Sequence, residues 1–265
     1  MSESSKLFDL SGRVALVTGA GQGVGRGIAG LLAAFGAAVV VNDYHLDRAR
    51  AVADEIGAAG GRALGIQGDV TDYASVGRMF AGVAESFGEV DILINNAGNA
   101  GVTQGQGRPR LFWESEPEDW RRYLAVNLDG VMNCCRHALP GMVARRRGRL
   151  ITIISDAGRT GEGNGLEAYS AAKAGAAGLM RGLARGLGRH GVTANSIAIA
   201  ATETPAIAAA LQNEEAVKRM LAHYVVRRVG QPADGAAMAL FLASDASGWV
   251  TGQTYPVNGG FSFAM

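Results

Sequence analysis

Short hydrophobic runs alternate with amphipathic segments along the chain. The runs have strand length and lie at residues 13–18, 37–42, 63–67, 90–94, 149–154, 192–199 and 252–257. The longer segments between them repeat apolar residues every three or four positions, which favours helices at residues 46–59, 72–87, 117–143, 166–190 and 233–242. Strands without alternating polar positions are typical of a parallel sheet that is covered on both faces.

The order of these elements predicts the fold class. Strand and helix alternate without a linker or a change in composition, which favours one α/β domain over residues 1–265. We expect a doubly wound, Rossmann-type parallel sheet with right-handed crossovers and helices on both faces. Residues 1–9 are expected to form an N-terminal tail, and residues 202–228 a helical excursion that acts as a lid over the substrate.

Composition narrows the function classes. The 265 residues are 48% hydrophobic and 18% charged with a formal net charge of +1, so neither nucleic acid nor an anionic membrane is an expected partner. The start of the chain is polar and no apolar run could span a bilayer, which predicts a cytoplasmic protein. Cys134 and Cys135 are adjacent and have no metal-ligand spacing to a histidine, so no disulfide framework and no metal site are expected. The basic cluster at residues 145–149 is interpreted as a solvated helix end.

A glycine-rich turn follows the first predicted strand. Thr18, Gly19, Gly23 and Gly25 have the spacing TGxxxGxG, and an apolar helix pattern continues to Phe35. Strand, turn and helix in this order can form a dinucleotide site, where glycines let the backbone approach the pyrophosphate and the helix N-terminus supplies free N–H groups. The alternative is an ordinary turn between a strand and a helix. The expected cofactor contacts in this turn are Gly19, Gln22, Gly23, Val24 and Gly25.

Asp43 ends the second predicted strand and bears on the choice of cofactor. A carboxylate here can accept hydrogen bonds from both adenosine ribose hydroxyls and would repel a 2′-phosphate. Neither Tyr44 nor Gln22 is a cation that could bind such a phosphate, so NAD is preferred to NADP. The alternative role for Asp43 is a helix cap.

Two more turns at strand ends complete the predicted cofactor site. Asp69, next to Val70, either reaches the adenine amino group or caps the helix at residues 72–87. In the NNAG turn at residues 95–98, side-chain amides such as that of Asn96 can connect neighbouring strand ends. Gly98 in the same turn lets the backbone come close to the cofactor.

Tyr169 and Lys173 are four residues apart in a segment that favours a helix, so their side chains share one helix face. A positive charge beside a phenol favours the phenolate and lowers the pKa of the phenol. The pair therefore predicts a general base that works near neutral pH. The same spacing also arises by chance on amphipathic helices, and the other motifs decide between these readings.

In their order along the chain, five motifs resemble those of the short-chain dehydrogenase/reductase family: TGxxxGxG, NNAG, Asn127 within VNL, Ser155 three residues before Gly158, and YxxxK. The resemblance extends from residue 10 to residue 260. It implies that Tyr169 is the acid/base, that Lys173 lowers its pKa and holds the nicotinamide ribose, and that Ser155 orients the substrate oxygen. Asn127 would hold a water molecule that links Lys173 to solvent. The structural alternatives are a helix cap for Ser155 and a side chain that satisfies a helix bend for Asn127.

The chain departs from the family pattern at three places. The segment from Ser155 to Tyr169 is one residue longer than the commonest spacing, the loop at residues 99–116 is longer than usual, and Ile199 and Ala200 replace the frequent Pro-Gly. After this replacement, Thr202 and Thr204 still occupy positions suited to the carboxamide of the cofactor. The resemblance also implies that the helices at residues 117–143 and 167–189 pair across a two-fold axis, so we expect a homotetramer, with a dimer as the fallback.

The leading hypothesis is an NAD-dependent dehydrogenase that acts on a small-molecule secondary alcohol. The alternatives are an NADPH-dependent reductase of a 3-ketoacyl compound or a hydroxysteroid, and a non-catalytic dinucleotide-binding protein, against which the intact Ser155, Tyr169 and Lys173 argue. Residues 155–161 (SDAGRTG) are similar to those of family members that oxidise alicyclic hydroxyacyl-CoA thioesters. Three arginines could then bind the CoA phosphates: Arg108, Arg110 and Arg159. A hydroxysteroid or a sugar alcohol fits equally well, and the sequence leaves the substrate and the reaction direction open.

Overall fold

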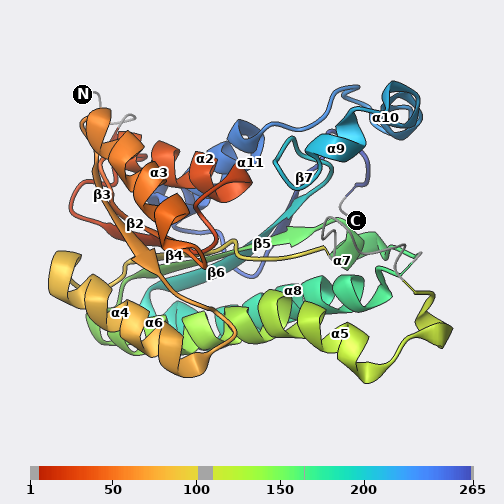
Figure 1. Ribbon diagram of the computed structural model, residues 1–265. Coiled ribbons are helices and arrows are strands. Elements are labelled where there is room, and N and C mark those ends of the chain that lie inside the picture. Colours follow the sequence, from red (N-terminus) through yellow and green to blue (C-terminus); the bar gives the residue numbers. More distant parts are fainter. Residues whose placement is uncertain (1–5, 101–109, 164, 264–265) are drawn as a thin grey trace.

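The computed structural model describes residues 6–100, 110–163 and 165–263, and within these ranges seven parallel strands form one sheet (Figure 1). The strand order is β3-β2-β1-β4-β5-β6-β7, so the chain reverses its direction of travel across the sheet between β1 and β4. Such a reversal opens a crevice at the carboxyl ends of the strands, where α/β proteins bind ligands. The strands are β1 (Val14–Val17), β2 (Ala38–Asp43), β3 (Arg62–Gln67), β4 (Ile92–Asn95), β5 (Gly148–Ser155), β6 (Val192–Ile199) and β7 (Thr254–Val257).

Helices cover both faces of the sheet (Figure 1). One layer consists of α2 (Gly23–Ala34), α3 (Leu46–Ala58) and α11 (Pro232–Ala243), and its buried residues form one hydrophobic core with the sheet. The opposite layer consists of α4 (Tyr73–Phe87), α6 (Gly130–Arg145) and α8 (Glu167–Leu187), which form the second core. The predicted doubly wound α/β fold is therefore confirmed, and each strand begins and ends within two residues of its predicted bounds.

Three predicted elements differ from the structure. The helix predicted at residues 117–143 is divided into α5 (Pro117–Leu124), the π-helical segment η2 (Ala125–Asp129) and α6. The loop predicted after Ser155 begins with a helical turn, α7 (Ala157–Thr160). The excursion at residues 202–228 contains only two short helices, α9 (Ala208–Leu211) and α10 (Glu214–Leu221).

The remaining described elements are short 3₁₀ turns, η1 (Phe112–Glu114), η3 (Gly188–His190) and η4 (Asp245–Ser247). Throughout the described residues, each helix is too short or too polar to cross a membrane.

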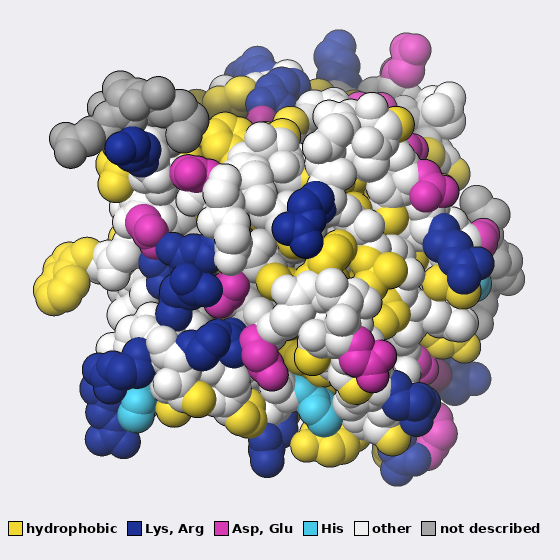
Figure 2. Space-filling view, turned by 90° about the vertical axis from the view of Figure 1, so that its left-hand side faces the viewer, with side chains coloured by type: hydrophobic (Ala, Val, Ile, Leu, Met, Phe, Trp, Pro, Cys, Tyr) yellow, Lys and Arg dark blue, Asp and Glu magenta, His cyan; other side chains and the backbone are white. Residues whose placement is uncertain are grey.

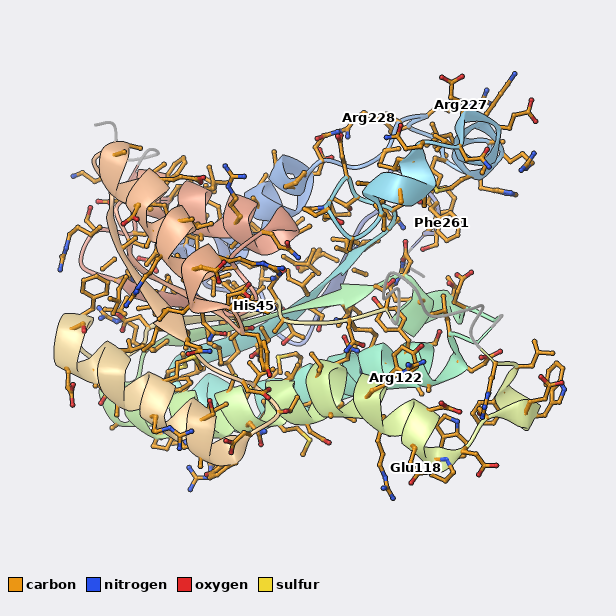
Figure 3. The ribbon with its side chains drawn as sticks, in the orientation of Figure 1. His45, Glu118, Arg122, Arg227, Arg228 and Phe261 are labelled. Carbon is orange, nitrogen blue, oxygen red and sulfur yellow. The ribbon has the colours of Figure 1, made fainter. Side chains whose placement is uncertain are left out.

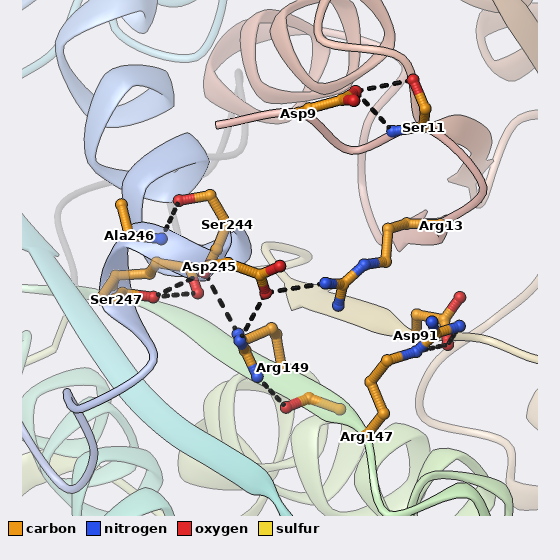
Figure 4. Close-up of polar contacts among 12 residues, drawn as sticks. Asp9, Ser11, Arg13, Asp91, Arg147, Arg149, Ser244, Asp245, Ala246 and Ser247 are labelled. Carbon is orange, nitrogen blue, oxygen red and sulfur yellow. Dashed lines mark hydrogen bonds and ion pairs between the residues drawn. The ribbon is translucent and has the colours of Figure 1, made fainter. Parts of the chain in front are cut away.

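The basic cluster at residues 145–149 is only partly a solvated helix end. Arg149 lies in β5, is 7% exposed and pairs with Asp245, which also pairs with Arg13 (Figure 4). Arg147 pairs with the buried Asp91. These ion pairs join the amino ends of the strands, away from the crevice at their carboxyl ends. Figure 2, which shows the left-hand side of Figure 1, accordingly has cationic and anionic side chains next to one another.

Candidate active site

A cavity of about 830 Å³ lies at the carboxyl ends of the strands. Its lining combines residues from the ends of β2, β4, β5 and β6 with residues of α8 and of the excursion between Thr202 and Tyr224. Segments far apart in the sequence therefore meet at the place where the strand order predicts a ligand site. Most predicted site residues line this cavity: Gly19, Gln22, Gly23, Val24, Asp43, Asp69, Val70, Asn96, Ser155, Tyr169, Lys173, Thr202 and Thr204.

The glycine-rich turn has the backbone that its sequence predicts. Gly19 and Gly23 have φ values of 60° and 58°, a region that residues with a side chain rarely adopt. A Cβ at Gly19 would lie 2.8 Å from the Cα of Ala97, so the β1 and β4 ends can approach only because this residue is glycine. Helix α2 starts at Gly23, and the side chain of its N-cap residue, Gln22, makes no capping hydrogen bond. The free N–H groups of this first turn, with the close backbone, fit a bound pyrophosphate.

Asn96 supports this turn from the end of the neighbouring strand. Its Nδ2 donates to the carbonyl oxygens of Thr18 at 2.9 Å and Gly19 at 3.0 Å. The Oγ1 of Thr18 in turn accepts the backbone N–H groups of Asn96 and Ala97. The predicted connection between strand ends is therefore present. Gly25 belongs to the same arrangement, because a Cβ there would collide with the Asn96 amide.

Asp43 is 6% exposed and holds the turn in place. Its Oδ2 accepts the backbone N–H of Gly21 at 3.1 Å, and its Oδ1 accepts that of His45 at 3.0 Å. The second bond closes the turn before α3, but Asp43 does not cap that helix, because His45 is the N-cap residue and no described side chain accepts an N–H of its first turn. Asp43 lines the cavity, and each of its carboxylate oxygens can accept a further hydrogen bond, as ribose hydroxyls would require.

Asp69 does not cap α4, contrary to one of its two predicted roles. Its Oδ1 accepts the N–H and the hydroxyl of Thr71, whereas Asp72 is the N-cap and accepts the N–H of Ala74. Asp69 lines the cavity together with Val70, as a contact to adenine would require.

Tyr169, Lys173 and Ser155 lie together at the cavity. The hydroxyl of Ser155 lies close enough to the Tyr169 phenol to lower its pKa by hydrogen bonding. The Oγ of Ser155 also accepts the N–H of Ala157, the first residue of α7, at 3.2 Å, whereas the N-cap residue of α7 is Asp156. The Nζ of Lys173 lies 5.8 Å from the centre of the Tyr169 ring and donates to the carbonyl oxygen of Ile153 at 3.0 Å. The helical spacing therefore brings the ammonium group to the phenol ring face.

The pKa values of this pair differ from the simplest expectation. Burial raises the pKa of Tyr169, and the hydrogen bond with Ser155 offsets part of that rise. Burial lowers the pKa of Lys173 to about 8. The predicted lowering of the Tyr169 pKa is therefore wrong in direction, because it rested only on the attraction between the ammonium and the phenolate. The buried surroundings disfavour both charged forms.

Asn127 is fully buried in the π-helical segment η2. Its Nδ2 donates to the carbonyl oxygens of Tyr123 at 3.0 Å and Asn99 at 2.9 Å, and its Oδ1 accepts the N–H of Asn99. The side chain thus satisfies the helix irregularity, as its structural alternative proposed. A Cβ at Gly98 would lie 2.8 Å from the Asn127 Oδ1 and 3.0 Å from the Lys173 Nζ, so this glycine brings the backbone between the two groups.

Ile199, the last residue of β6, and Ala200 after it stand in the place of Pro-Gly. Ala200 and Ala201 line the cavity, and Thr202 forms a parallel bridge with Gly230. Both ends of the excursion are therefore tied together beside the site. Thr202 is buried and its hydroxyl donates to the Ala200 carbonyl oxygen, whereas Thr204 is partly buried.

Several residues at the cavity were not predicted, and one predicted phosphate ligand is wrong. Arg48, Tyr224 and Phe261 line it, and only the aromatic character of the last two in a chain with 6% aromatic residues could have drawn attention to them. Arg159 is not available for a CoA phosphate, because it pairs with Asp156 and is 16% exposed. Arg110 pairs with Asp119, and Arg108 lies outside the described residues.

Comparisons with known proteins agree with this geometry. A protein-family model described as enoyl-(acyl carrier protein) reductase matches residues 19–262. The chain is 38% identical to the 3-oxoacyl-[acyl-carrier-protein] reductase FabG of Escherichia coli (strain K12), over 96% of this chain and 98% of that protein. It is also 38% identical, with the same coverage, to the (2S)-[(R)-hydroxy(phenyl)methyl]succinyl-CoA dehydrogenase subunit BbsD of Thauera aromatica. A solved 7 alpha-hydroxysteroid dehydrogenase, in complex with NADH and 7-oxo glycochenodeoxycholic acid, superposes with a TM-score of 0.90 at 36% identity and covers 98% of both chains.

Proposed function

We propose that this chain, which belongs to the short-chain dehydrogenase/reductase family of oxidoreductases, is an NAD-dependent dehydrogenase of a secondary alcohol. The observation that carries the proposal is that Ser155, Tyr169, Lys173 and Asp43 all line one cavity. This cavity therefore combines a proton-transfer group with a site suited to adenosine. Reduction of NAD, followed by absorbance with a panel of butan-2-ol, cyclohexanol, 2-decalol and a hydroxyacyl-CoA thioester, tests this activity directly.

The proposed roles follow from the contacts of each group. Tyr169 accepts the hydroxyl proton of the alcohol, and Ser155, already hydrogen-bonded to the phenol, donates to the substrate oxygen. Lys173 stabilises the phenolate form and holds the nicotinamide ribose. Asn127 holds a water molecule that links Lys173 to solvent, and its bonds to Asn99 fix the backbone beside it. The bound cofactor supplies the acceptor for the hydride.

Two alternative functions would make different use of the same residues. An NADPH-dependent reductase would use the same residues in the opposite direction, and the negative charge of the Asp43 carboxylate is what disfavours it. A non-catalytic dinucleotide-binding protein would have no need for the contact between Ser155 and Tyr169.

We further propose that the subunits form a homotetramer. Light scattering of the purified protein measures this oligomeric state.

Purified protein is expected to bind NADH at least tenfold more tightly than NADPH, a difference of about 1.4 kcal/mol. The physical reason is that the Asp43 carboxylate is buried and held by two backbone N–H groups, so it cannot turn away from a 2′-phosphate. Calorimetric titration with both cofactors measures the ratio.

The matched variants are Asp43→Asn and Asp47→Asn. Asp43→Asn removes the charge that repels the phosphate, so the preference for NADH should shrink. Asp47 is exposed in the first turn of α3 and does not line the cavity, so Asp47→Asn should keep the wild-type ratio. Equal affinities of the wild-type protein for NADH and NADPH would contradict the assignment of NAD.

The excursion between Thr202 and Gly230 is proposed to act as a lid. Helices α9 and α10 contain no buried residue, yet the excursion supplies Pro205, Ile207 and Met220 to the cavity lining. Backbone that is so weakly packed opens readily. Amide hydrogen exchange at residues 206–223 should be faster than in β6 and should slow when NADH and cyclohexanone are added. An unchanged exchange rate in this segment would count against a lid.

A further inference from the structure

The C-terminal segment after β7 is bound to the loop that follows Ser155. The carboxylate of Asp156, which is 2% exposed, accepts hydrogen bonds from three side chains. Its donors are Asn258 Nδ2 at 2.6 Å, Ser262 Oγ at 2.9 Å and Arg159 Nη1 at 2.7 Å. The residue next to Ser155 therefore holds the end of the chain.

Arg159 completes this cluster, which we name the C-terminal clamp (Asp156, Arg159, Asn258 and Ser262). Its guanidinium also donates to Ser262 Oγ at 2.6 Å and to the carbonyl oxygen of Phe263 at 2.9 Å. The Asp156 carboxylate at the centre of this network is buried and hydrogen-bonded, which favours one arrangement, because loss of its partners leaves a buried charge unpaired.

Phe261 lies inside the segment that the clamp holds, and its side chain lines the same cavity as Ser155 and Tyr169. Its ring packs against the ring of Tyr224, with 5.3 Å between the centroids. Tyr224 is 6% exposed, and its hydroxyl accepts the N–H of Ala201. Figure 3 shows Phe261 between the part of the molecule that contains α9 and α10 and the part that contains α7. We name these two rings the aromatic wall.

The rest of the substrate region is apolar or acidic. Leu166, Ile207 and Met220 line the cavity together with the aromatic wall, and Glu162 adds a carboxylate. The cations among the described lining residues are Lys173, beside Tyr169, and Arg48. Arg48 lies beside Asp43, since a Cβ placed on Gly21 would contact both residues. Among the described residues that line the cavity, no Lys or Arg is thus left over to bind a carboxylate or phosphate near the aromatic wall.

We propose that the aromatic wall binds the apolar ring system of a bulky alicyclic or aryl secondary alcohol, and that the clamp keeps Phe261 in register with Ser155. The inference rests on the proposed dehydrogenase function and names the substrate class of that site. Aromatic rings suit a large apolar substrate because they bury much area with little loss of conformational freedom. Glu162 disfavours an anionic group in the same place. Phe261 is thus a specificity-determining residue, and Asp156 and Ser262 are positioning residues.

The test uses 2-decalone as the probe and the full chain with bound NAD, because the oxidised cofactor cannot reduce the ketone. Calorimetric titration should show that Phe261→Ala lowers the affinity for 2-decalone at least tenfold, about 1.4 kcal/mol. The same variant should keep its affinity for NADH, because the glycine-rich turn and Asp43 are unchanged. Phe261 is 38% exposed, so its truncation leaves the core intact.

Phe263→Ala is the matched control. Phe263 lies in the same segment, but its ring is 72% exposed and does not line the cavity, so this variant should bind 2-decalone like the wild type. Ser262→Ala tests the clamp, because it keeps both rings and removes only the hydroxyl between Asp156 and Arg159. It should weaken 2-decalone binding by about threefold or more without changing the affinity for NADH.

The outcomes separate this inference from the proposed function. Failure of every alcohol to reduce NAD would overturn the dehydrogenase function, whereas binding of 2-decalone would still report on the wall. The wall is overturned if the wild-type complex does not bind 2-decalone, or if Phe261→Ala and Phe263→Ala bind it equally well. Wild-type binding by Ser262→Ala would overturn the positioning role of the clamp.

Discussion

Tyr169→Phe is expected to lower the turnover of a secondary alcohol at saturating NAD by about 10²–10⁴-fold, the range typical of losing a general acid–base. The substitution removes only the phenol oxygen, which carries the transferable proton and the hydrogen bond with Ser155. The ring stays, and so does its edge-to-face contact with the Tyr123 ring, whose centroid is 6.4 Å away. The affinity for NADH should remain at the wild-type value, because the glycine-rich turn and Asp43 are unchanged. The measurement is kcat by NAD reduction, together with calorimetric titration of NADH.

Tyr123→Phe is the matched control for this experiment. Tyr123 is 3% exposed and touches the Tyr169 ring, but its hydroxyl contacts Arg122 and its side chain does not line the cavity. Loss of this phenol should leave turnover close to wild type. If Tyr169→Phe retains more than about a tenth of wild-type turnover, the phenol is not the base. A comparable loss in Tyr123→Phe would show instead that packing around the ring accounts for the effect.

Lys173→Met should lower turnover by two orders of magnitude or more and should also alter the pH profile. Methionine keeps the apolar part of a side chain that is 5% exposed, so the core is filled while the charge is lost. Loss of the ammonium group removes the positive charge that favours the phenolate, while burial continues to raise the pKa of Tyr169. The affinity for NAD should also fall, since the substitution removes the proposed ribose contact. The measurements are kcat against pH and the dissociation constant of NADH.

The direction in which the wild-type oxidation rate changes with pH follows from the protonation of Tyr169 and Lys173. Below pH 8, Lys173 and Tyr169 each hold a proton, because the pKa of Lys173 is about 8 and that of Tyr169 is raised. Raising the pH removes one proton from the pair. The pair then exists either as amine with phenol or as ammonium with phenolate, and the second form contains the base. The oxidation rate should therefore rise with pH and level off above an apparent pKa near 8, a value that belongs to the pair.

Lys173→Met should move the rise in rate to higher pH, because only the phenol remains to titrate. An unchanged profile in this variant would mean that another group controls the proton transfer. Lys173→Arg offers a second comparison, because arginine keeps the positive charge but carries it on a planar guanidinium group. Arginine stays protonated throughout this range, so it cannot exchange a proton with Tyr169.

Much of the site was predictable because its determinants are local. The positive φ of Gly19 and Gly23 follows from glycine itself, and the shared face of Tyr169 and Lys173 follows from four-residue helical spacing. The place of Asp43 at the end of β2 follows from a continuous apolar run. Each of these features needs only residues that are neighbours in the sequence.

The features that were missed depend on partners far along the chain. Arg159 meets Ser262 across 103 residues, which removes it from the predicted phosphate site. Arg149 meets Asp245 across 96 residues, so it is buried and not solvated at a helix end. A charged residue has the same sequence pattern whether its partner is water or a distant carboxylate, because the pattern reports no long-range contact.

The sequence by itself determined the alternation of strands and helices, the glycine turn and the spacing of the proposed catalytic residues, since hydrophobic periodicity and backbone preference act over a few residues. Only the tertiary structure decided the direction of the pKa shifts of Tyr169 and Lys173, because burial depends on all the elements packed around them. It also decided that Phe261 and Tyr224 meet at the cavity that Ser155 lines. Those residues come from three separate segments, and the strand order of the sheet brings the segments together.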